Sequence, residues 1–364
     1  MMLDPRYRER IARVREGLAE RGIEALWVEP SVGLYYLTGL EPVSVERLFG
    51  LVIRATGELS LVVPLLLRDE CEHLEEAEFH VWDDGGGPQA AAGKALAGLS
   101  KLHVQGSLPA GALFLLQKVR PGLEVEEDPG ILSGLREYKD VSEVELLRRS
   151  GRITDDTVGW VGALPLAEMT ERELAGEVQS RYLRLGYRPT PEGLIATGAN
   201  AAMPHYVGGE ARIDPSRPLL MDFGCAVEGY WSDITRLYFP QEPGSEPEEV
   251  YEIVCRAYDA ALAVVEPGVP AEEVDRAARR EIEAAGYGEQ FLHRTGHGLG
   301  LEMHEEPYIR EGSDRPLEVG HVFSIEPGIY LKGRFGVRYE NIVHLGEDGP
   351  ESMNESPRIH RFPE

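Results

Sequence analysis

The stretch MDFGCAVEGYWSD, residues 221–233, carries the strongest indication of how this chain folds. Asp222 and Asp233 lie eleven positions apart, and two glycines interrupt the apolar run between them. We expect a β-hairpin that turns near Val227 and Glu228, so that the two aspartates face each other at roughly 4.5–5.5 Å between Cβ atoms. Two carboxylates this close repel each other unless a proton or a cation lies between them.

The stretch SIEPGIYLKGRFGVRYE, residues 324–340, repeats the arrangement, because Glu326 and Glu340 are equidistant from Gly333. Two strand–turn–strand units would then bring four acids to one end of a sheet. Acids make up 63 of 364 residues, so a single pair arises easily by chance. However, Asp222 and Glu326 interrupt apolar runs, where a carboxylate is costly unless it is paired or bound to a metal.

A third stretch, RTGHGLGLEMHEEP over residues 294–307, places His297 and His304 among glycines. Four carboxylates and one imidazole suit a pair of divalent ions such as Mn, Fe, Co or Zn. Such ions make water nucleophilic and polarise a carbonyl group, which is the chemistry of hydrolysis. A single-zinc HExxH site is disfavoured, because Arg294 stands where that motif needs glutamate.

The composition indicates a globular protein of two domains, with 364 residues, 42% hydrophobic and 27% charged. A net charge of −26 argues against nucleic-acid or anionic-membrane partners. Three scattered cysteines favour a reducing compartment. We find neither the apolar core of a signal peptide nor a run of about 18 apolar residues, and we therefore expect a cytoplasmic protein without a membrane partner.

Strand-like and helical segments alternate in the first part of the chain, which predicts an α/β domain with a partly parallel sheet. The strand-like runs are residues 23–30, 35–39, 49–54, 59–67, 79–84 and 102–106. Long helices are expected over 141–164, 170–187, 248–265 and 270–287, with strand-like runs between and after them. Thr170 and Glu173 form a capping-box pair. The boundary is expected near residues 132–140, followed by an α+β domain.

Five motifs occur in the order of a known family: HYVGG, MDFGCAVEGYWSDITR, HRTGHGLGLEMHE, SIEPGIY and GVRYENIV. They span roughly residues 140–350, and this part resembles the pita-bread metallopeptidases, specifically the Xaa-Pro group of aminopeptidase P and prolidase. The first domain, through VGLYYLTGL, more weakly resembles the creatinase-like N-terminal domain of the same proteins. The resemblance implies an α/β creatinase-like domain over 1–135, with a role in oligomerisation or substrate access. An α+β pita-bread catalytic domain would follow over 136–364.

The resemblance also implies roles for individual residues. The ligands of two divalent ions (Mn, Co or Zn) would be Asp222, Asp233, His297, Glu326 and Glu340, with Asp233 and Glu340 bridging both ions. The catalytic groups would be His205 beside the scissile bond, Glu326 as proton acceptor, and His304. The substrate-binding residues would be His293, His304, Tyr330 and Arg338. One position departs from the family, which usually has an acid where this chain has Asn341.

The implied activity is hydrolysis of the peptide bond that precedes proline in short peptides, by a metallo-exopeptidase of the aminopeptidase P or Xaa-Pro dipeptidase type. A homodimer is expected by resemblance alone. Three alternatives stay open. A methionine aminopeptidase uses the same ligands but usually lacks such an N-terminal domain. A creatinase-like amidinohydrolase works without metal. A non-catalytic relative that only binds its ligand would belong to a different functional class.

Overall fold

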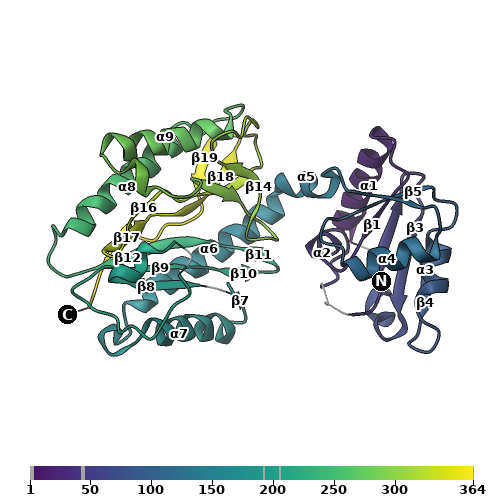
Figure 1. Ribbon diagram of the computed structural model, residues 1–364, viewed down its shortest axis with the longest axis horizontal. Helices are drawn as coiled ribbons and strands as arrows, with labels where there is room; N and C mark the ends of the chain where they lie inside the picture. Colours follow the sequence, from purple (N-terminus) through teal and green to yellow (C-terminus); the bar gives the residue numbers. More distant parts are fainter. Residues whose placement is uncertain (1–3, 42–45, 192, 205, 364) are drawn as a thin grey trace. The chain divides into compact units, whose positions relative to one another are not determined.

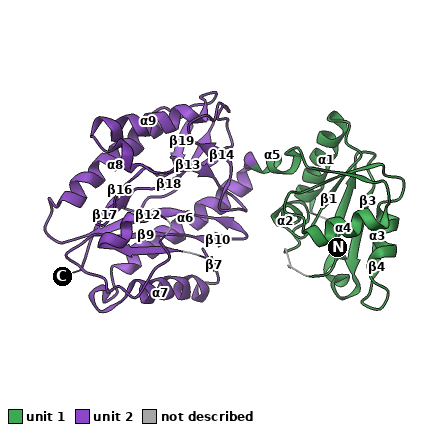
Figure 2. Cartoon of the chain, in the orientation of Figure 1, with its two compact units in different colours: residues 1–136 green, residues 137–364 purple. Residues whose placement is uncertain are grey.

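The computed structural model describes residues 4–41, 46–191, 193–204 and 206–363, with the helices and strands arranged as in Figure 1. The chain divides into two units, Met1–Arg136 and Glu137–Glu364, which Figure 2 shows in different colours. Within the described residues, no helix combines the length and the apolar character that crossing a bilayer requires.

Unit 1 is built on a six-stranded sheet in the order β4-β3-β2-β1-β5-β6. The strands are β1 Ala25–Val28, β2 Gly50–Arg54, β3 Leu59–Pro64, β4 Glu78–Trp82, β5 Lys101–Val104 and β6 Glu124–Glu127. The helices are α1 Pro5–Glu20, α2 Val32–Thr38, α3 Gln89–Ala95, α4 Ala110–Val119 and α5 Ile131–Glu137. The pairs β3–β4, β1–β5 and β5–β6 are parallel and the other two are antiparallel, which confirms the partly parallel α/β sheet.

One expected strand of unit 1 is wrong. Residues 35–39 lie in helix α2 and its C-cap, although their sequence YYLTG is rich in strand-forming residues. The Ser31 side chain accepts a hydrogen bond from the Leu34 backbone N–H at the start of the helix, and Gly39 ends it with a φ of 73°. Favourable ends and burial of the helix therefore outweigh the local strand preference.

Unit 2 holds four α-helices, three short 3-10 helices and four small sheets within its described residues. The α-helices are α6 Val141–Val161, α7 Glu171–Arg184, α8 Glu246–Ala263 and α9 Ala271–Ala284. The strands are β7 Arg188–Pro189, β8 Leu194–Thr197, β9 Leu219–Phe223, β10 Cys225–Val227, β11 Tyr230–Trp231, β12 Ile234–Phe239, β13 Gly296–Gly298, β14 Glu305–Ile309, β15 Val322–Ile325, β16 Gly328–Leu331, β17 Phe335–Arg338, β18 Asn341–Gly346, β19 Gly349–Ser352 and β20 Ile359–Arg361. The capping box of Thr170 and Glu173 at the start of α7 is confirmed.

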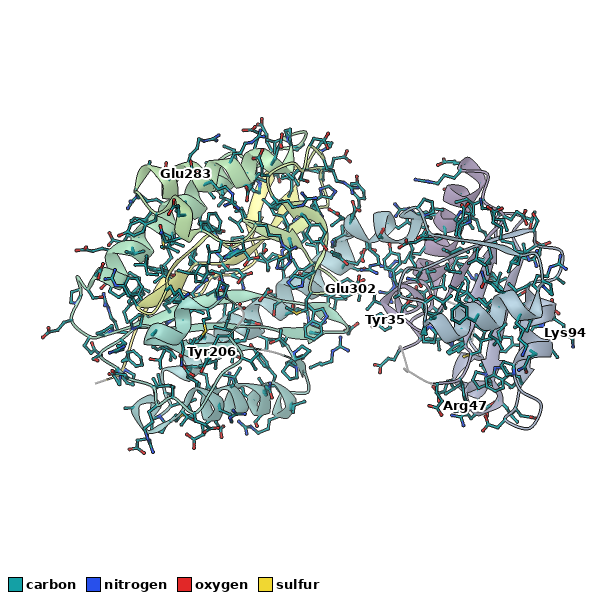
Figure 3. All side chains as sticks on the ribbon, in the orientation of Figure 1. Tyr35, Arg47, Lys94, Tyr206, Glu283 and Glu302 are labelled. Carbon is teal, nitrogen blue, oxygen red and sulfur yellow. The ribbon has the colours of Figure 1, made fainter. Side chains whose placement is uncertain are left out.

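The sheets of unit 2 lie between two helix pairs. Helix α8 packs on β15, β16 and β17, and α9 packs on β14, whereas α6 contacts β10 to β12 and α7 contacts β7 and β8. The two larger sheets have the orders β20-β12-β9-β8 and β14-β13-β15-β18-β19. Side chains fill the space between these layers (Figure 3). Each larger sheet contributes strands to the same interior, and this is where the predicted site residues meet.

Candidate metal centre

Asp222 and Asp233 come from one strand–turn–strand unit. Its turn is formed by Glu228 and Gly229, with φ values of 48° and 85°, as a two-residue hairpin turn requires. The ladder between β9 and β12 pairs Asp222 with Thr235. The expected pairing of Asp222 with Asp233 is therefore wrong, and the partner lies two residues further along the chain. Because side chains alternate with a period of two, this shift keeps both aspartates on the same face.

Glu326 and Glu340 come from a second unit, and its predicted register is confirmed. The ladders β15–β18 and β16–β17 share one register centred on Gly333, which has a φ of 76°. Glu326 and Glu340 occupy facing positions in the interval between these two ladders. Neither acid therefore takes part in a regular cross-strand pair.

The glycines around His297 are required by close packing of strands. A Cβ atom added at Gly296 would lie 1.9 Å from the Ser324 carbonyl oxygen, and one at Gly298 would lie 2.2 Å from the Glu306 carbonyl oxygen. Strand β13 is therefore held between β14 and β15 at a distance that only glycine permits on either side of the histidine. This arrangement fixes the imidazole inside the protein, where it is only 3% exposed.

Hydrogen bonding sets the tautomer of His297. Its Nδ1 lies 3.0 Å from the Gly298 carbonyl oxygen, which can only accept, so Nδ1 carries the proton. The Nε2 lone pair then faces Glu326, whose Oε1 is 3.3 Å away. This is the form in which an imidazole binds a metal ion.

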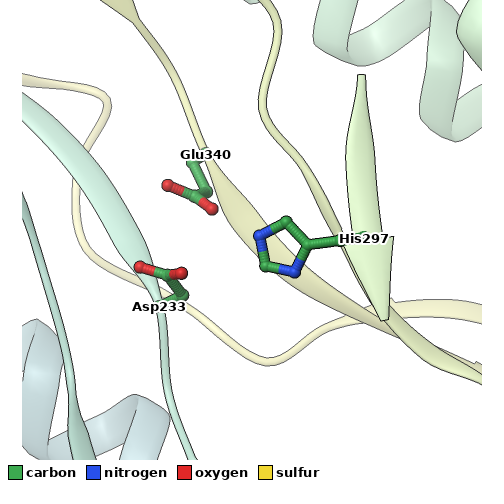
Figure 4. A group of neighbouring side chains, drawn as sticks. All are labelled: Asp233, His297 and Glu340. Atoms are coloured by element: carbon green, nitrogen blue, oxygen red, sulfur yellow. The ribbon is translucent and has the colours of Figure 1, made fainter. Parts of the chain in front are cut away.

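Three buried side chains offer ligand atoms that all lie within 4.8 Å of one another: Asp233, His297 and Glu340. His297 lies in β13, Asp233 directly precedes β12 and Glu340 directly precedes β18, and the three side chains point toward one another (Figure 4). Glu326 contacts this group through His297. Asp222 adds a half-buried carboxylate, which is near enough to Asp233 to affect its ionisation.

Burial and mutual repulsion oppose ionisation of these acids. Burial, together with the neighbouring carboxylates, raises the pKa of Asp233 and of Glu340 well above the ordinary range. Burial raises the pKa of Glu326 to about 7. Burial, and then the nearby His304, lowers the pKa of His297 to about 3, so the imidazole is neutral. A divalent cation removes this conflict, because it neutralises the carboxylates and accepts the imidazole lone pair. Oxygen and imidazole ligands in a buried group thus fit such an ion.

The group lies in a cavity of about 760 Å³ within unit 2. Eight of the predicted site residues line it: Asp222, Asp233, His293, His297, His304, Glu326, Arg338 and Glu340. Tyr330 lies behind the wall, where its hydroxyl is 2.8 Å from His293 Nε2 and 2.7 Å from Arg338 Nη1. His205 falls outside the described residues.

Comparison with known proteins decides the family. Residues 145–347 match Metallopeptidase family M24, and residues 10–137 match the Creatinase/Prolidase N-terminal domain. This chain belongs to metallopeptidase family M24. The pita-bread catalytic domain and the creatinase-like domain before it are thereby established, and the divalent metal dependence of the family matches the buried ligand group.

Relatives of this M24 metallopeptidase match it over nearly their whole length. The probable dipeptidase PepE of Mycobacterium tuberculosis is 35% identical over 96% of this chain and 95% of its own. The Xaa-Pro dipeptidase of Pyrococcus horikoshii is 31% identical over 96% of this chain and 98% of its own. The crystal structure of prolidase from Thermococcus sibiricus superimposes with a TM-score of 0.92 at 34% identity, covering 98% of each chain.

The M24 metallopeptidase also holds its acids with side chains that the sequence did not single out. Thr235 donates to Glu340 Oε2 at 2.6 Å and accepts from Arg338 Nε at 2.8 Å. Buried Arg236 donates to the Glu340 carbonyl oxygen at 2.7 Å and to Asn341 Oδ1 at 2.6 Å. The unusual Asn341 is therefore a partner of Arg236. No sequence signal singled out Thr235, because the expected register paired Asp222 with Asp233 instead.

Replacing Glu340 by glutamine is expected to stabilise the metal-free protein at pH 8. A carboxyl group whose pKa is raised on folding destabilises the fold once pH exceeds its ordinary value, because ionisation is then opposed only in the folded state. Glutamine removes that charge, so the metal-free variant should melt several degrees above metal-free wild type at pH 8. Below pH 4.5, where the wild-type carboxyl is protonated in both states, the difference should vanish.

Thermal denaturation with and without a chelator measures this effect. Adding Mn²⁺ should reverse the order at pH 8, because wild type then gains binding energy that the variant lacks. Equal melting temperatures of the two metal-free proteins at pH 8 would show that burial and the neighbouring carboxylates do not oppose ionisation of Glu340.

Glu171 anchors one wall of the cavity of this M24 metallopeptidase. It is fully buried and accepts hydrogen bonds from the backbone N–H groups of Thr197 at 2.7 Å and Gly209 at 3.1 Å. It also accepts from Asn200 at 3.0 Å and from the Tyr206 hydroxyl at 2.7 Å. One carboxylate thus holds both ends of the segment that carries cavity-lining Tyr206.

Glu171→Ala is expected to lower the free energy of unfolding by at least about 2 kcal/mol, because several buried donors lose their acceptor. KM should rise more than kcat falls, with the metal content unchanged, because the substrate-facing wall loosens while the ligand group stays intact. Urea denaturation, steady-state kinetics and metal analysis measure these effects. Glu177→Ala, an exposed glutamate on the same helix, is the control and should change neither property. An unchanged KM in a destabilised Glu171 variant would rule out the anchoring role.

Proposed function

We propose that this M24 metallopeptidase hydrolyses Xaa-Pro dipeptides and holds two divalent ions, Mn, Co or Zn, during the reaction. The observation that carries the proposal is the buried group of Asp233, His297 and Glu340 at the wall of a substrate-sized cavity. Glu326 and Asp222 would complete the ligand set. The relatives named Xaa-Pro dipeptidase and prolidase support the choice of substrate.

Different residues of the chain would act in different steps of the hydrolysis. When bound, the ions acidify water and polarise the scissile carbonyl group. Glu326, a carboxylate 3.3 Å from His297 in the proposed ligand group, would accept the proton that the attacking water loses. His205 would stabilise the negative charge that develops on the carbonyl oxygen when the carbonyl carbon is attacked. The proline nitrogen must gain a proton as it leaves, and exposed His304, which lines the cavity, would supply it.

His293, Tyr330 and Arg338 would orient the substrate and the ligand set. Tyr330 hydrogen-bonds to both of the other two, so it fixes the wall that the substrate meets. Arg338 also binds Asp222 directly, and this contact ties the wall to the proposed ligand group. A substitution of any of these three hydrogen-bonded residues should therefore affect metal affinity as well as substrate binding.

Peptide cleavage by the metal-loaded protein tests the proposal. Ala-Pro should be cleaved far faster than Met-Ala or Ala-Ala, and a chelator should abolish the activity. Preference for Met-Ala would favour a methionine aminopeptidase instead. Absence of any peptide cleavage with a full metal complement would point to a binding protein.

The homodimer, the cytoplasmic location and the role of residues 1–135 in oligomerisation or substrate access stay predictions. Light scattering of the purified protein measures the first of these directly. A mass near twice 40.3 kDa is expected for the dimer.

A further inference from the structure

A buried ion pair lies beside the segment that carries His304. Lys139 Nζ donates a hydrogen bond to Glu305 Oε1 at 2.8 Å, and the two side chains are only 1% and 7% exposed. Glu305 is the first residue of β14 and directly follows His304. The pair thus joins two segments of unit 2 that are 166 positions apart in the sequence, at a point next to a cavity-lining histidine.

Burial gives this contact a defined geometry. A charge away from water is costly unless it is paired, so each partner of the pair holds the other in place. Lys139 Nζ also donates to the Glu137 carbonyl oxygen at 3.3 Å. The backbone of Lys139 is fixed as well, because its N–H donates to the Gly320 carbonyl oxygen at 2.9 Å. Lys139 is therefore held at both its backbone and its charged end, and it holds Glu305 in turn.

The segment between β13 and β14 packs on the ion pair. A Cβ atom added at Gly300 would lie 2.6 Å from Glu305 Oε1 and 3.1 Å from Lys139 Cε. Trp231 holds the start of the same segment. Its backbone N–H donates to the Gly300 carbonyl oxygen at 2.9 Å, and its indole N–H donates to the Leu301 carbonyl oxygen at 3.1 Å. The ion pair holds the end of the segment, where β14 begins.

His304 lies at this end of the segment. Its ring centre is 4.2 Å from that of His297, and its side chain is exposed where it lines the cavity. Glu305 is buried and does not line the cavity, as expected where successive side chains point to opposite sides of an extended backbone. The backbone that places the Glu305 carboxylate against Lys139 therefore also sets where the His304 ring lies.

We propose that Lys139 is a positioning residue for His304 and acts through its buried ion pair with Glu305. The inference rests on the proposed function, in which His304 gives a proton to the proline nitrogen as the C–N bond breaks. Such a transfer needs donor and acceptor within hydrogen-bond reach, and a displacement of about 1 Å can cost roughly 10²-fold in rate. Without Lys139, the buried Glu305 carboxylate loses the cation that neutralises it and would shift toward water, and the adjoining His304 backbone would shift with it.

A double-mutant cycle with Ala-Pro as substrate tests the inference. Lys139→Met should lower kcat by about 10- to 100-fold, with KM and metal content close to those of wild type. In a His304→Gln background, where the proton donor is already absent, the same substitution should change kcat by less than about 2-fold. Lys139→Arg should recover part of the lost turnover, because it keeps a cation beside Glu305.

Lys332→Met is the matched control, because Lys332 is an exposed lysine in the turn between β16 and β17. It should leave kcat unchanged in both backgrounds. Melting temperature establishes that each variant is folded. If Lys139→Met does not fold, Glu305→Gln takes its place in the cycle, and the same two results are expected.

The outcomes separate the inference from the proposed function. Equal losses of kcat in the two backgrounds, or loss of metal from Lys139→Met, would overturn the inference and leave Xaa-Pro hydrolysis intact. Wild-type turnover by His304→Gln would overturn it too, because the ion pair would then have no proton donor to position. Failure of wild type to cleave Ala-Pro would overturn the proposed function and the inference with it.

Discussion

Replacing Asp233 by alanine is expected to lower kcat for Ala-Pro by at least about 10³-fold and to reduce the bound metal. Asp233 is buried, lies within the ligand group of His297 and Glu340, and is proposed to bind both ions. Its loss removes a ligand and a negative charge at once. The expected effect therefore exceeds the 10²–10³-fold typical of a single lost hydrogen-bond donor in an active site.

Steady-state kinetics and metal analysis of the same preparation measure this effect. Glu283→Ala is the control, because Glu283 is an exposed acid on α9 and also removes one negative charge (Figure 3). It should leave both quantities unchanged. Retention of wild-type metal content and turnover by Asp233→Ala would remove Asp233 from the ligand set.

His205→Ala is expected to lower kcat by about 10²–10⁴-fold while the metal content stays unchanged. The role of this residue rests on the resemblance of HYVGG to the family motif, because His205 lies outside the described residues. Its neighbours Pro204 and Tyr206 line the cavity. A residue that stabilises the oxyanion should affect turnover and leave the ligand group complete.

The variant His205→Gln distinguishes stabilisation of the oxyanion from transfer of a proton. Glutamine can donate a hydrogen bond but cannot transfer a proton, so partial recovery of kcat relative to alanine would support oxyanion stabilisation. Loss of metal in proportion to activity in the alanine variant would show that His205 is a ligand. In that case the proposed set of five ligands would be incomplete.

The sequence was most informative where local geometry alone determines position. Gly333 is the natural turn of its hairpin, and the symmetry of Glu326 and Glu340 about it predicted the observed register. The other hairpin turns one residue later than expected, since Glu228 and Gly229 both adopt positive φ. That choice depends on a non-glycine residue in a left-handed conformation, which sequence patterns rarely predict.

Features that depend on tertiary contacts could not be predicted from the sequence. Helix α2 forms despite its strand-like residues, because its ends are capped and most of its residues are buried. The stacking of Arg294 on Tyr308 joins residues fourteen positions apart across a ladder whose register shifts after His297. The anchoring of Tyr206 by Glu171 likewise arises only when helix α7 packs beside the cavity wall. Each of these three features depends on contacts between segments that are distant in the sequence, and a local sequence pattern does not predict such contacts.

Anomalous X-ray diffraction from crystals of the Mn²⁺-loaded enzyme tests the central claim most directly, because it locates the ions themselves. The account predicts two anomalous peaks, both within coordination distance of Asp233 and Glu340, with Asp222 beside one and His297 and Glu326 beside the other. A single peak, or peaks away from these five side chains, would contradict it.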